Sequence, residues 1–504
     1  MLKDKLILTL GFSCALTMLA NAEKKPNVVF IIADDLTYDA VSALGNDEIK
    51  TPNLDRLHKK AANFTHVFNQ GAFSPAVSLA SRTMLNTGKY IWRAASATPA
   101  KLKLAGNWPK DAAAYVPNKV KIAPFWSDYM KEAGYDTYMA GKWHVTQDPA
   151  KIFDVTQNIR SGMPGTVADS YAVSAKSPNG RHFDPNHKDA WHAADKSIGG
   201  QWEGGEHWCK VLADDALSFI ETATKKDNPY FMYIGFTAPH DPRQSPQEYL
   251  DMYDADKMAV PENFQEVYPY HAQIGANYNS LRDERLLPNP RTKYSVQVTR
   301  KEYYALTSYM DNQIGRILDA LEAAGQMDNT YIIFTADHGL AVGDHGFAGK
   351  QNMYDASIRV PFFIVGPGVK KRDVKGMYYL QDAMATAMDI AGSDKLSEVD
   401  FKSLLPLAKG AKTSDAAQKA VYCAYVGLQR MYRTEDYKLI IYPSANTVRL
   451  YDMKKDPKEL NDLAGDAKYR KTIDALFADL QKMQVELEDQ LDLTPYYNNF
   501  FAKK

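Results

Sequence analysis

Short apolar runs alternate with longer amphipathic segments along most of the chain. The apolar runs are rich in β-branched and aromatic residues, and each predicts a buried strand of a sheet. They cover residues 27–32, 135–140, 229–236 and 331–336. Apolar residues at helical spacing predict helices at 126–134, 215–224 and 306–321. Buried strands alternating with helices indicate an α/β fold, in which helices flank a large parallel or mixed sheet.

The pattern changes beyond about residue 395. Short strands separated by turn residues predict a small antiparallel sheet there. They cover residues 420–425, 429–434, 437–442 and 448–452. The next helix has an apolar face that can pack on this sheet, formed by Ile473, Leu476, Phe477, Leu480, Met483 and Leu487. We therefore expect a catalytic domain at 23–395 and a C-terminal α+β subdomain at 396–504.

The first 22 residues have the pattern of a secretory signal peptide. A short charged start precedes a largely apolar stretch at 6–20, and Ala-Asn-Ala ends the segment. We predict that residues 1–22 direct export across an inner membrane, to a periplasmic location. No later stretch approaches 18 uninterrupted apolar residues, so we expect no integral membrane segment in the mature chain. Cys14 follows a poor lipobox, so we do not expect a lipid anchor there.

Composition narrows the classes of partner. The chain has 60 basic and 61 acidic residues and a net charge of -1, which gives no electrostatic case for nucleic-acid binding. An anionic substrate would therefore need a local cluster of cations. Without the leader, Cys209 and Cys423 are the cysteines that remain, far apart in sequence, and a disulfide between them is not favoured. No Cys/His spacing indicates structural zinc.

Chemically useful side chains follow each of the four predicted strands. They are Asp34 and Asp35, Lys142 and His144, His240, and Asp337 with His338. Functional groups of open α/β sheets lie beyond the carboxyl ends of strands, and adjacent carboxylates there can hold a divalent cation. Each signal has a plain structural alternative: Asp-Asp often marks a turn, and a lysine beside a histidine is as often a surface residue beside a packed one. Four such strand ends are much harder to obtain by chance than one.

The segment Phe73 to Gly88 organises the rest of the chain. Pro75 and the small residues after it predict a turn into a helix, and Arg82 lies on the same helical face as Ser78, one turn further along. A helix start beside an arginine favours an anion. By itself, a serine near a helix start is more often a cap than a nucleophile.

Ser78-Leu79-Ala80-Ser81-Arg82 resembles the signature of the type I sulfatases, which reads Cys or Ser, any residue, Pro or Ala, any residue, Arg. Ser78 and Ala80 make it similar to the serine-type branch. Other similar segments extend the resemblance over nearly the whole mature chain; they are 51–57, 141–144, 334–361 and 436–461. The resemblance implies an alkaline-phosphatase-like fold.

The resemblance also implies a cofactor and roles. In that family the first signature residue is oxidised to formylglycine, which here implies conversion of Ser78 by a radical-type sulfatase maturase. Arg82 and Lys142 would stabilise the hydrated aldehyde, His144 would assist sulfate release, and His240 with Lys350 would assist departure of the alcohol. A metal site is implied at Asp34, Asp35, Ser78, Asp337 and His338. Its oxygen-rich donors favour Ca²⁺ over zinc or copper, with Mg²⁺ as the alternative.

The resemblance implies hydrolysis of sulfate esters, and we expect a sulfated sugar of a glycan as the substrate. The tryptophan-rich region at 181–208 would suit sugar stacking, but a folded loop that covers the sheet is the favoured interpretation. A choline or aryl sulfatase is an alternative. A phosphatase or phosphonate hydrolase of the same superfamily would typically need two metals, for which the chain has too few ligands. An inactive glycan-binding homologue is the non-enzyme alternative. The presence of all five expected catalytic partners of Ser78 argues against it; they are Arg82, Lys142, His144, His240 and Lys350.

Overall fold

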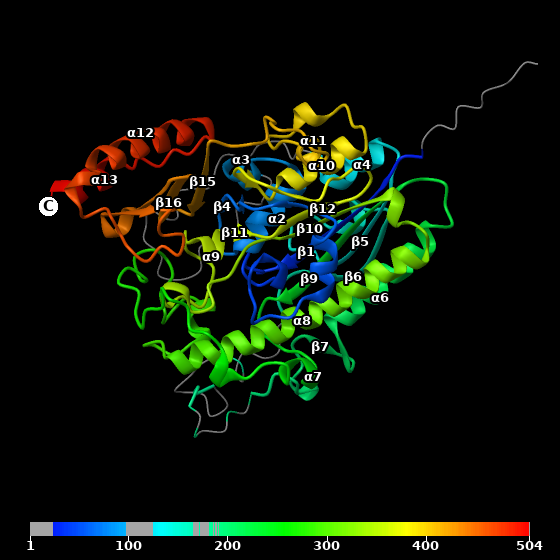
Figure 1. Cartoon of the computed structure of the whole chain (residues 1–504), viewed down its shortest axis with the longest axis horizontal. Coiled ribbons are helices and arrows are strands. Elements are labelled where there is room, and N and C mark those ends of the chain that lie inside the picture. Colours follow the sequence, from blue (N-terminus) through cyan, green and yellow to red (C-terminus); the bar gives the residue numbers. More distant parts are fainter. Residues whose placement is uncertain are drawn as a thin grey trace, which may run out of the picture.

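The computed structural model describes residues 24–96, 124–164, 171, 181–184, 186, 189 and 191–502. Its main feature is an eight-stranded sheet with the strand order β13-β2-β12-β10-β1-β9-β5-β6 (Figure 1). From one edge to the other these strands are Arg372–Val374, Ala62–Phe64, Phe362–Val365, Thr330–Ala336, Asn27–Asp34, Tyr230–Pro239, Asp136–Lys142 and Val155–Arg160.

The four strands predicted from apolar runs lie together at the centre of this sheet. β10, β1, β9 and β5 are neighbours and run parallel, so their carboxyl ends meet at one edge. Every residue of β1 is buried, as expected for a strand covered on both faces. β12 is antiparallel to β10, and β2 is antiparallel to β12. The sheet is therefore mixed, and its parallel part holds the predicted strand ends.

Helices cover both faces of the sheet (Figure 1). α6 (Trp208–Ala223) and α8 (Lys293–Ala323) pack together against β9. α2 (Val77–Thr87), α4 (Trp126–Glu132) and α10 (Asp382–Ile390) pack together on the other side. α6 and α8 begin earlier than predicted, because caps outside the apolar repeat start them. The His207 ring accepts from the Cys209 N–H, and the Thr292 hydroxyl accepts from the Ser295 N–H.

The predicted C-terminal sheet is present. β15 (Ala420–Tyr425), β16 (Gln429–Thr434), β17 (Tyr437–Tyr442) and β18 (Thr447–Asp452) pair antiparallel in order. α12 (Arg470–Glu486) packs on this sheet through its predicted apolar face. A fifth strand, β4 (Gly71–Ala72), pairs parallel to β15, although it lies far upstream in the sequence. The segment that leads into α2 is thereby attached to the C-terminal sheet.

Two further expectations concern the described residues. Cys209 and Cys423, between which a disulfide was not favoured, are both buried and free. Among the described helices, none combines the length and apolarity needed to cross a bilayer. The predicted leader and Cys14 lie outside the described residues.

Two of the three tryptophans in the 181–208 region, Trp191 and Trp202, pack as structural residues. The Trp191 ring lies 4.6 Å from the Tyr171 ring, and its indole N–H donates to Glu302 at 3.2 Å. Trp202 is buried and meets the His207 ring edge-on. These contacts favour the folded-loop interpretation over sugar stacking for both side chains.

Candidate active site

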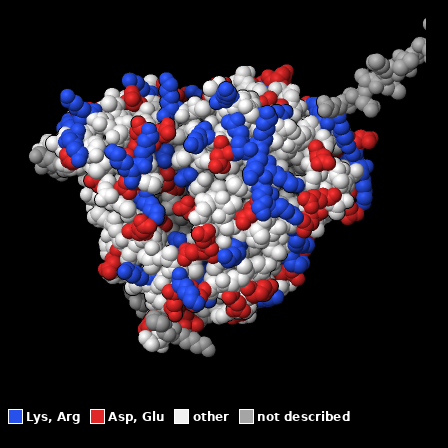
Figure 2. Space-filling view, in the orientation of Figure 1, with Lys and Arg blue, Asp and Glu red and all other residues white. Residues whose placement is uncertain are grey.

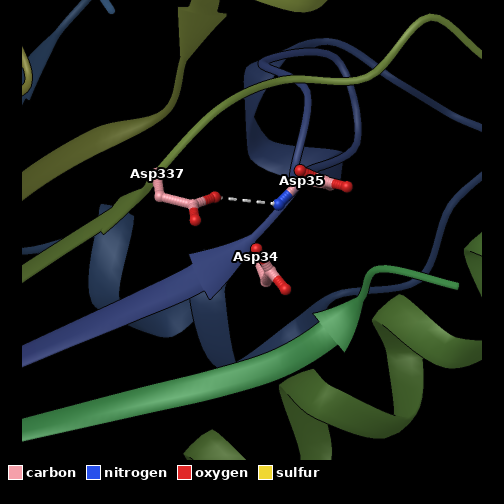
Figure 3. A group of neighbouring side chains, drawn as sticks. All are labelled: Asp34, Asp35 and Asp337. Carbon is pink, nitrogen blue, oxygen red and sulfur yellow. Dashed lines mark hydrogen bonds between the residues drawn. The ribbon is translucent and has the colours of Figure 1, made fainter. Parts of the chain in front are cut away.

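Three buried carboxylates lie where two central strands end. Asp34 is the last residue of β1, Asp35 follows it, and Asp337 follows β10 (Figure 3). One oxygen of each lies within 4.8 Å of the others. The Asp35 N–H donates to Asp337 Oδ1 at 3.2 Å, and Asp35 has a positive φ of 68°. The turn after β1 thus places the carboxylates of Asp34 and Asp35 beside Asp337, at the end of β10.

Each carboxylate has a cation of its own. Lys142 Nζ contacts Asp34 Oδ2, and Arg82 Nε donates to Asp337 Oδ2 at 2.8 Å. Lys350 Nζ lies 2.6 Å from both oxygens of Asp35. Burial acts to raise the pKa of Asp337, but Arg82, Lys142 and Lys350 outweigh it and hold that pKa below its usual value. The centre is therefore a compensated cluster of buried charges.

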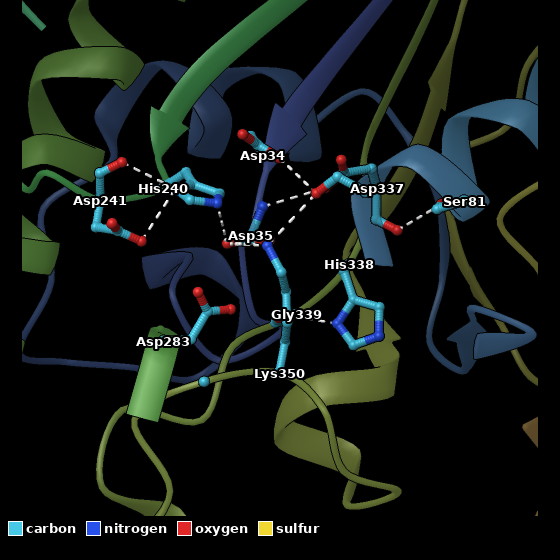
Figure 4. Close-up of polar contacts among 12 residues, drawn as sticks. Asp34, Asp35, Ser81, His240, Asp241, Asp283, Asp337, His338, Gly339 and Lys350 are labelled. Carbon is cyan, nitrogen blue, oxygen red and sulfur yellow. Dashed lines mark hydrogen bonds and ion pairs between the residues drawn. The ribbon is translucent and has the colours of Figure 1, made fainter. Parts of the chain in front are cut away.

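The donor set fits a hard divalent cation. Three buried carboxylate oxygens within 4.8 Å of one another are the ligands that Ca²⁺ and Mg²⁺ prefer. Ser78 Oγ donates to Asp34 Oδ1 at 3.1 Å and therefore lies beside the carboxylate cluster. His338 is buried beside this cluster, and its Nδ1 donates to Gly339 O at 2.9 Å (Figure 4). Burial lowers the pKa of His338 to about 4, so the ring is neutral and Nε2 keeps its lone pair. Metal binding by His338 stays a prediction.

Ser78 is the second residue of α2, and the helix begins without a side-chain cap. Its hydroxyl is buried between Asp34 and Lys350, 3.4 Å from Lys350 Nζ. The capping interpretation therefore does not apply to this serine. As the spacing predicted, Arg82 lies one turn further along the same helix. Its Nη1 donates to Lys142 O at 2.8 Å. The helix start, with its partial positive charge, is directed at the cluster.

Lys142 and His144 reach the same region, but not as the extended segment we expected. β5 ends at Lys142, and His144 has a positive φ of 52°. Burial lowers the pKa of His144 to about 2, and the nearby charges of Lys142 and Arg82 act in the same direction. Its Nδ1 is buried without a partner among the described residues. His144 is thus a neutral ring beside the cations of the centre.

His240 approaches from β9. Its Nε2 lies 3.4 Å from Asp35 Oδ2, and its Nδ1 donates to Asp241 O at 2.9 Å (Figure 4). Burial and Lys350 act to lower the pKa of His240, but Asp35 and Asp241 outweigh them and raise it. All six candidate catalytic residues are therefore gathered around the three carboxylates.

Sequence reasoning missed a second polar layer behind His240 and Lys350. Arg282 contacts Asp241 with both Nη atoms and lies 2.5 Å from Asp283 Oδ1, while Asp283 Oδ2 accepts from Gln351 at 2.9 Å. Arg282 and Asp283 belong to a charged run in a segment without periodicity, a pattern that usually indicates a solvated surface. Ser81 also positions the centre, because its hydroxyl donates to Asp337 O at 2.7 Å.

Surface charges on the face drawn in Figure 2 are mixed in sign. Figure 2 shows basic and acidic side chains interspersed over one face, as their nearly equal numbers suggest. The concentration of cations that an anionic substrate would need is instead buried at the strand ends, in Arg82, Lys142 and Lys350.

The chain is similar to known proteins over most of its length. A family profile described as Sulfatase matches residues 26–393, and one described as N-sulphoglucosamine sulphohydrolase, C-terminal, matches residues 343–486. The chain is 25% identical to the N-acetylglucosamine-6-O-sulfatase of Bacteroides thetaiotaomicron, over 92% of this chain and 87% of that protein. It is 26% identical to the choline-sulfatase of Rhizobium meliloti, over 87% of this chain and 82% of the other.

Solved structures show the same fold. A protein in complex with its substrate D-glucosamine-2-N,6-O-disulfate has a TM-score of 0.69 and 24% identity, covering 93% of this chain and 99% of the other. The phosphonate monoester hydrolase of Agrobacterium radiobacter has a TM-score of 0.66 and 22% identity, covering 92% and 96%. Both likenesses extend over the large sheet and the C-terminal part, so the predicted fold class is confirmed.

Proposed function

The chain belongs to the sulfatase family and is a sulfuric ester hydrolase, and we propose that it removes sulfate from a sugar of a glycan through a formylglycine made from Ser78. The observation that carries the proposal is the place of Ser78. Its hydroxyl lies at a helix start between Asp34 and Lys350, inside a cluster of buried cations. A sulfate ester held there would have positive groups around its oxygens while the nucleophile faces sulfur.

A plain serine is poorly suited to this task, because its hydroxyl is a weak nucleophile and Asp34, the carboxylate to which it donates, is already paired with Lys142. Conversion would remove two hydrogens from the side chain, and a radical-type maturase acting before export would take them up. When present, hydrated formylglycine supplies two hydroxyls: one to attack sulfur, the other to let the aldehyde re-form as sulfate leaves. The match of Ser78 and Ala80 to the serine-type signature supports this modification.

The metal proposal rests on the carboxylate cluster. Asp34, Asp35 and Asp337, with residue 78 and His338, would hold one Ca²⁺, with Mg²⁺ as the alternative. Such an ion supplies charge that polarises sulfate oxygens. Lys142, Arg82 and Lys350 then hold the three carboxylates in place.

The remaining residues would handle protons. His240 presents Nε2 to the site while Asp241 holds its Nδ1, which suits donation to the departing alcohol beside Lys350. His144, whose buried Nδ1 has no partner among the described residues, would assist the release of sulfate. Arg82 and Lys142 would stabilise the hydrated side chain of residue 78. Export through the leader at 1–22 would place this chemistry in the periplasm.

The glycan substrate is supported by relatives that act on sulfated amino sugars. The decisive assay is a panel with purified protein produced together with the maturase. It would contain sulfated mono- and disaccharides, aryl sulfates, choline sulfate and phosphate esters. We expect turnover of at least one sulfated sugar. Exclusive turnover of choline sulfate would contradict the glycan assignment, and binding without turnover of any sulfate ester would favour the inactive glycan-binding homologue.

A further inference from the structure

Lys350 lies at the end of a loop that a buried carboxylate holds by its main chain. Glu284 belongs to the short 3₁₀ helix η6 (Asp283–Leu286) and has no exposed surface. Its Oε1 accepts from the Gly349 N–H at 2.9 Å, and its Oε2 accepts from the Ala348 N–H at 3.1 Å. One side chain thus binds the two main-chain N–H groups that directly precede that of Lys350.

Arg291 supports this carboxylate and is buried as well. Its Nη2 donates to Glu284 Oε2 at 2.5 Å, so that oxygen binds both the arginine and the loop. Its Nε donates to Gly346 O at 2.9 Å, at the start of the same loop. The guanidinium also lies 3.8 Å from the centre of the Tyr278 ring, and the Tyr278 hydroxyl donates to Gly346 O at 2.9 Å. Glu284 and Arg291 together form a clamp on residues 346–350.

Lys350 itself is tied to the same short helix. Its N–H donates to Gln351 Oε1 at 3.1 Å, and Gln351 Nε2 donates to Asp283 Oδ2 at 2.9 Å. Each N–H of residues 348–350 is therefore held by η6, directly or through Gln351. The Lys350 side chain extends from this fixed main chain to the centre, where its Nζ lies 2.6 Å from both Asp35 oxygens (Figure 4).

Gly349 is a point of very close approach between the loop and η6. A Cβ at this position would lie 2.8 Å from Asp283 Cβ and 3.0 Å from Glu284 Oε1, which is closer than packed side chains tolerate. The carboxylate therefore reaches the main chain of the loop only because residue 349 has no side chain. This dependence offers a way to displace the clamp without changing any charge.

We propose that Glu284, supported by Arg291, is a positioning residue that sets the place of Lys350 Nζ between Asp35 and residue 78. A lysine side chain is long and flexible, so the place of its ammonium depends on how firmly its main chain is held. Glu284 acts through that main chain, because no hydrogen bond or ion pair among the described residues joins it to a candidate catalytic side chain. The inference rests on the proposed function for the role of Lys350 beside the departing alcohol. The alternative is a clamp that only stabilises the fold.

Two substitutions displace the clamp in different ways. Glu284→Gln keeps an acceptor for the Gly349 N–H but turns a donor toward Arg291 and the Ala348 N–H, which are themselves donors. Gly349→Ala leaves both charges of the clamp unchanged and forces the Glu284 carboxylate away from the loop. The second variant keeps the inference testable where the first fails to fold.

Asp311→Asn is the matched control. Asp311 of α8 is also a buried carboxylate that binds two consecutive main-chain N–H groups, that of Asn53 at 3.1 Å and that of Leu54 at 2.7 Å. These bonds attach α1 (Pro52–His58) to α8 and do not involve the loop that carries Lys350. A general loss of stability should therefore affect this variant and Glu284→Gln alike.

The chemical reactivity of Lys350 is the first measurement, and it needs no substrate. Limited acetylation followed by peptide mass spectrometry compares Lys350 with Lys142, the other buried lysine of the centre. Both amines should react slowly in the natural protein. In Glu284→Gln and in Gly349→Ala, Lys350 should react about tenfold faster relative to Lys142, because its loop opens locally, and Asp311→Asn should not change this ratio. An unchanged ratio in both clamp variants would overturn the inference.

The second measurement is kcat for a sulfated sugar that the natural protein turns over. Glu284→Gln should lower kcat about 10- to 100-fold, because a displacement of about 1 Å at a reacting group can cost that much. In a Lys350→Ala background the same substitution should cost less than about twofold, since residues that act through one another are not additive. Equal losses in the two backgrounds would show a purely structural role and would overturn the inference. Absence of turnover by the natural protein would count against the proposed function alone, because the acetylation result is obtained without substrate.

Discussion

Arg282 holds Asp241 with both Nη atoms, one of them at 3.0 Å, and Asp241 in turn receives the Nδ1–H of His240 through its main-chain oxygen. The arginine side chain is 44% exposed, while Asp241 and His240 are buried. This pair therefore fixes the orientation of the imidazole that would donate a proton to the departing alcohol. We infer that Arg282 is a positioning residue, which acts on His240 through Asp241.

If the Arg282–Asp241 pair positions His240, the effect of an Arg282 substitution on kcat should depend on the leaving group of the substrate. Arg282→Gln should lower kcat for a sugar sulfate about 10- to 100-fold, because a poorly held His240 gives less acid catalysis. An activated aryl sulfate, whose alcohol leaves without a proton, should be nearly unaffected. Arg56→Gln, which breaks the surface pair with Asp319, is the control. Equal losses for both substrates would show that Arg282 does not act through His240.

Asp337 should be needed both for metal binding and for charge balance. Asp337→Ala should abolish metal uptake and turnover, and should also cost about 3–5 kcal/mol of unfolding free energy because buried Arg82 loses its 2.8 Å ion pair and keeps only the longer one, at 3.8 Å, to Asp34. The double variant Asp337→Ala with Arg82→Met should recover stability without recovering metal. Elemental analysis and chemical denaturation measure the two effects. Zinc at one equivalent in the natural protein, or a stable single variant, would contradict this account.

Gly71 should be required for the attachment of β4 to the C-terminal sheet. A Cβ there would lie 1.9 Å from Ala424 O, and the φ of 91° already disfavours other residues. We expect Gly71→Ala to cost more than about 2 kcal/mol and to lower activity through the segment that precedes Ser78. Gly134→Ala is the control, since Gly134 has a φ of 87° and open space around it. Similar melting temperatures for both variants would show that the close approach is unimportant.

His207 should make stability fall in mild acid. Burial lowers the pKa of its ring from 6.5 to about 4, against the opposing bond to Gln244 O. Above pH 6.5 the ring is neutral in both states; between 6.5 and 4 only the unfolded chain takes up the proton, so stability is lost as pH falls through that window. The loss can reach about 3 kcal/mol. His207→Asn keeps a cap for α6 and should flatten this part of the curve, and an unchanged slope would exclude His207 as its cause.

The centre of the fold was predictable because continuous apolar runs mark β1, β5, β9 and β10 without knowledge of their partners. Their parallel pairing then brings Asp34, Asp337 and His240 to one edge. The strands β2, β4, β12 and β13 were not predicted, since two to four residues carry no period and their pairing depends on distant segments. The edge strand β6 was not predicted either, because its six residues are mostly polar and none is fully buried. β4 is defined by a contact between Gly71 and Ala424, which no local pattern shows.

The candidate site likewise has residues whose geometry the sequence predicted and residues whose geometry it did not. Residues within a motif, such as Ser78 and Arg82, keep the geometry that helical spacing predicts. His144 does not, because the chain turns left-handed immediately after β5. Arg282 was missed because its role depends on Asp241, a residue brought to it by β9 and not by sequence proximity.

The central claim is that Ser78 becomes an aldehyde, and mass spectrometry tests it most directly. Trypsin should release the peptide from Ala61 to Arg82. In protein from the native host, or from a host that supplies the radical-type maturase, this peptide should be lighter by about two mass units, the loss of two hydrogens needed for the nucleophile. Activity should rise in proportion to the converted fraction. Full activity in protein whose peptide contains only unmodified serine would contradict the account and favour phosphatase-like chemistry at the same site.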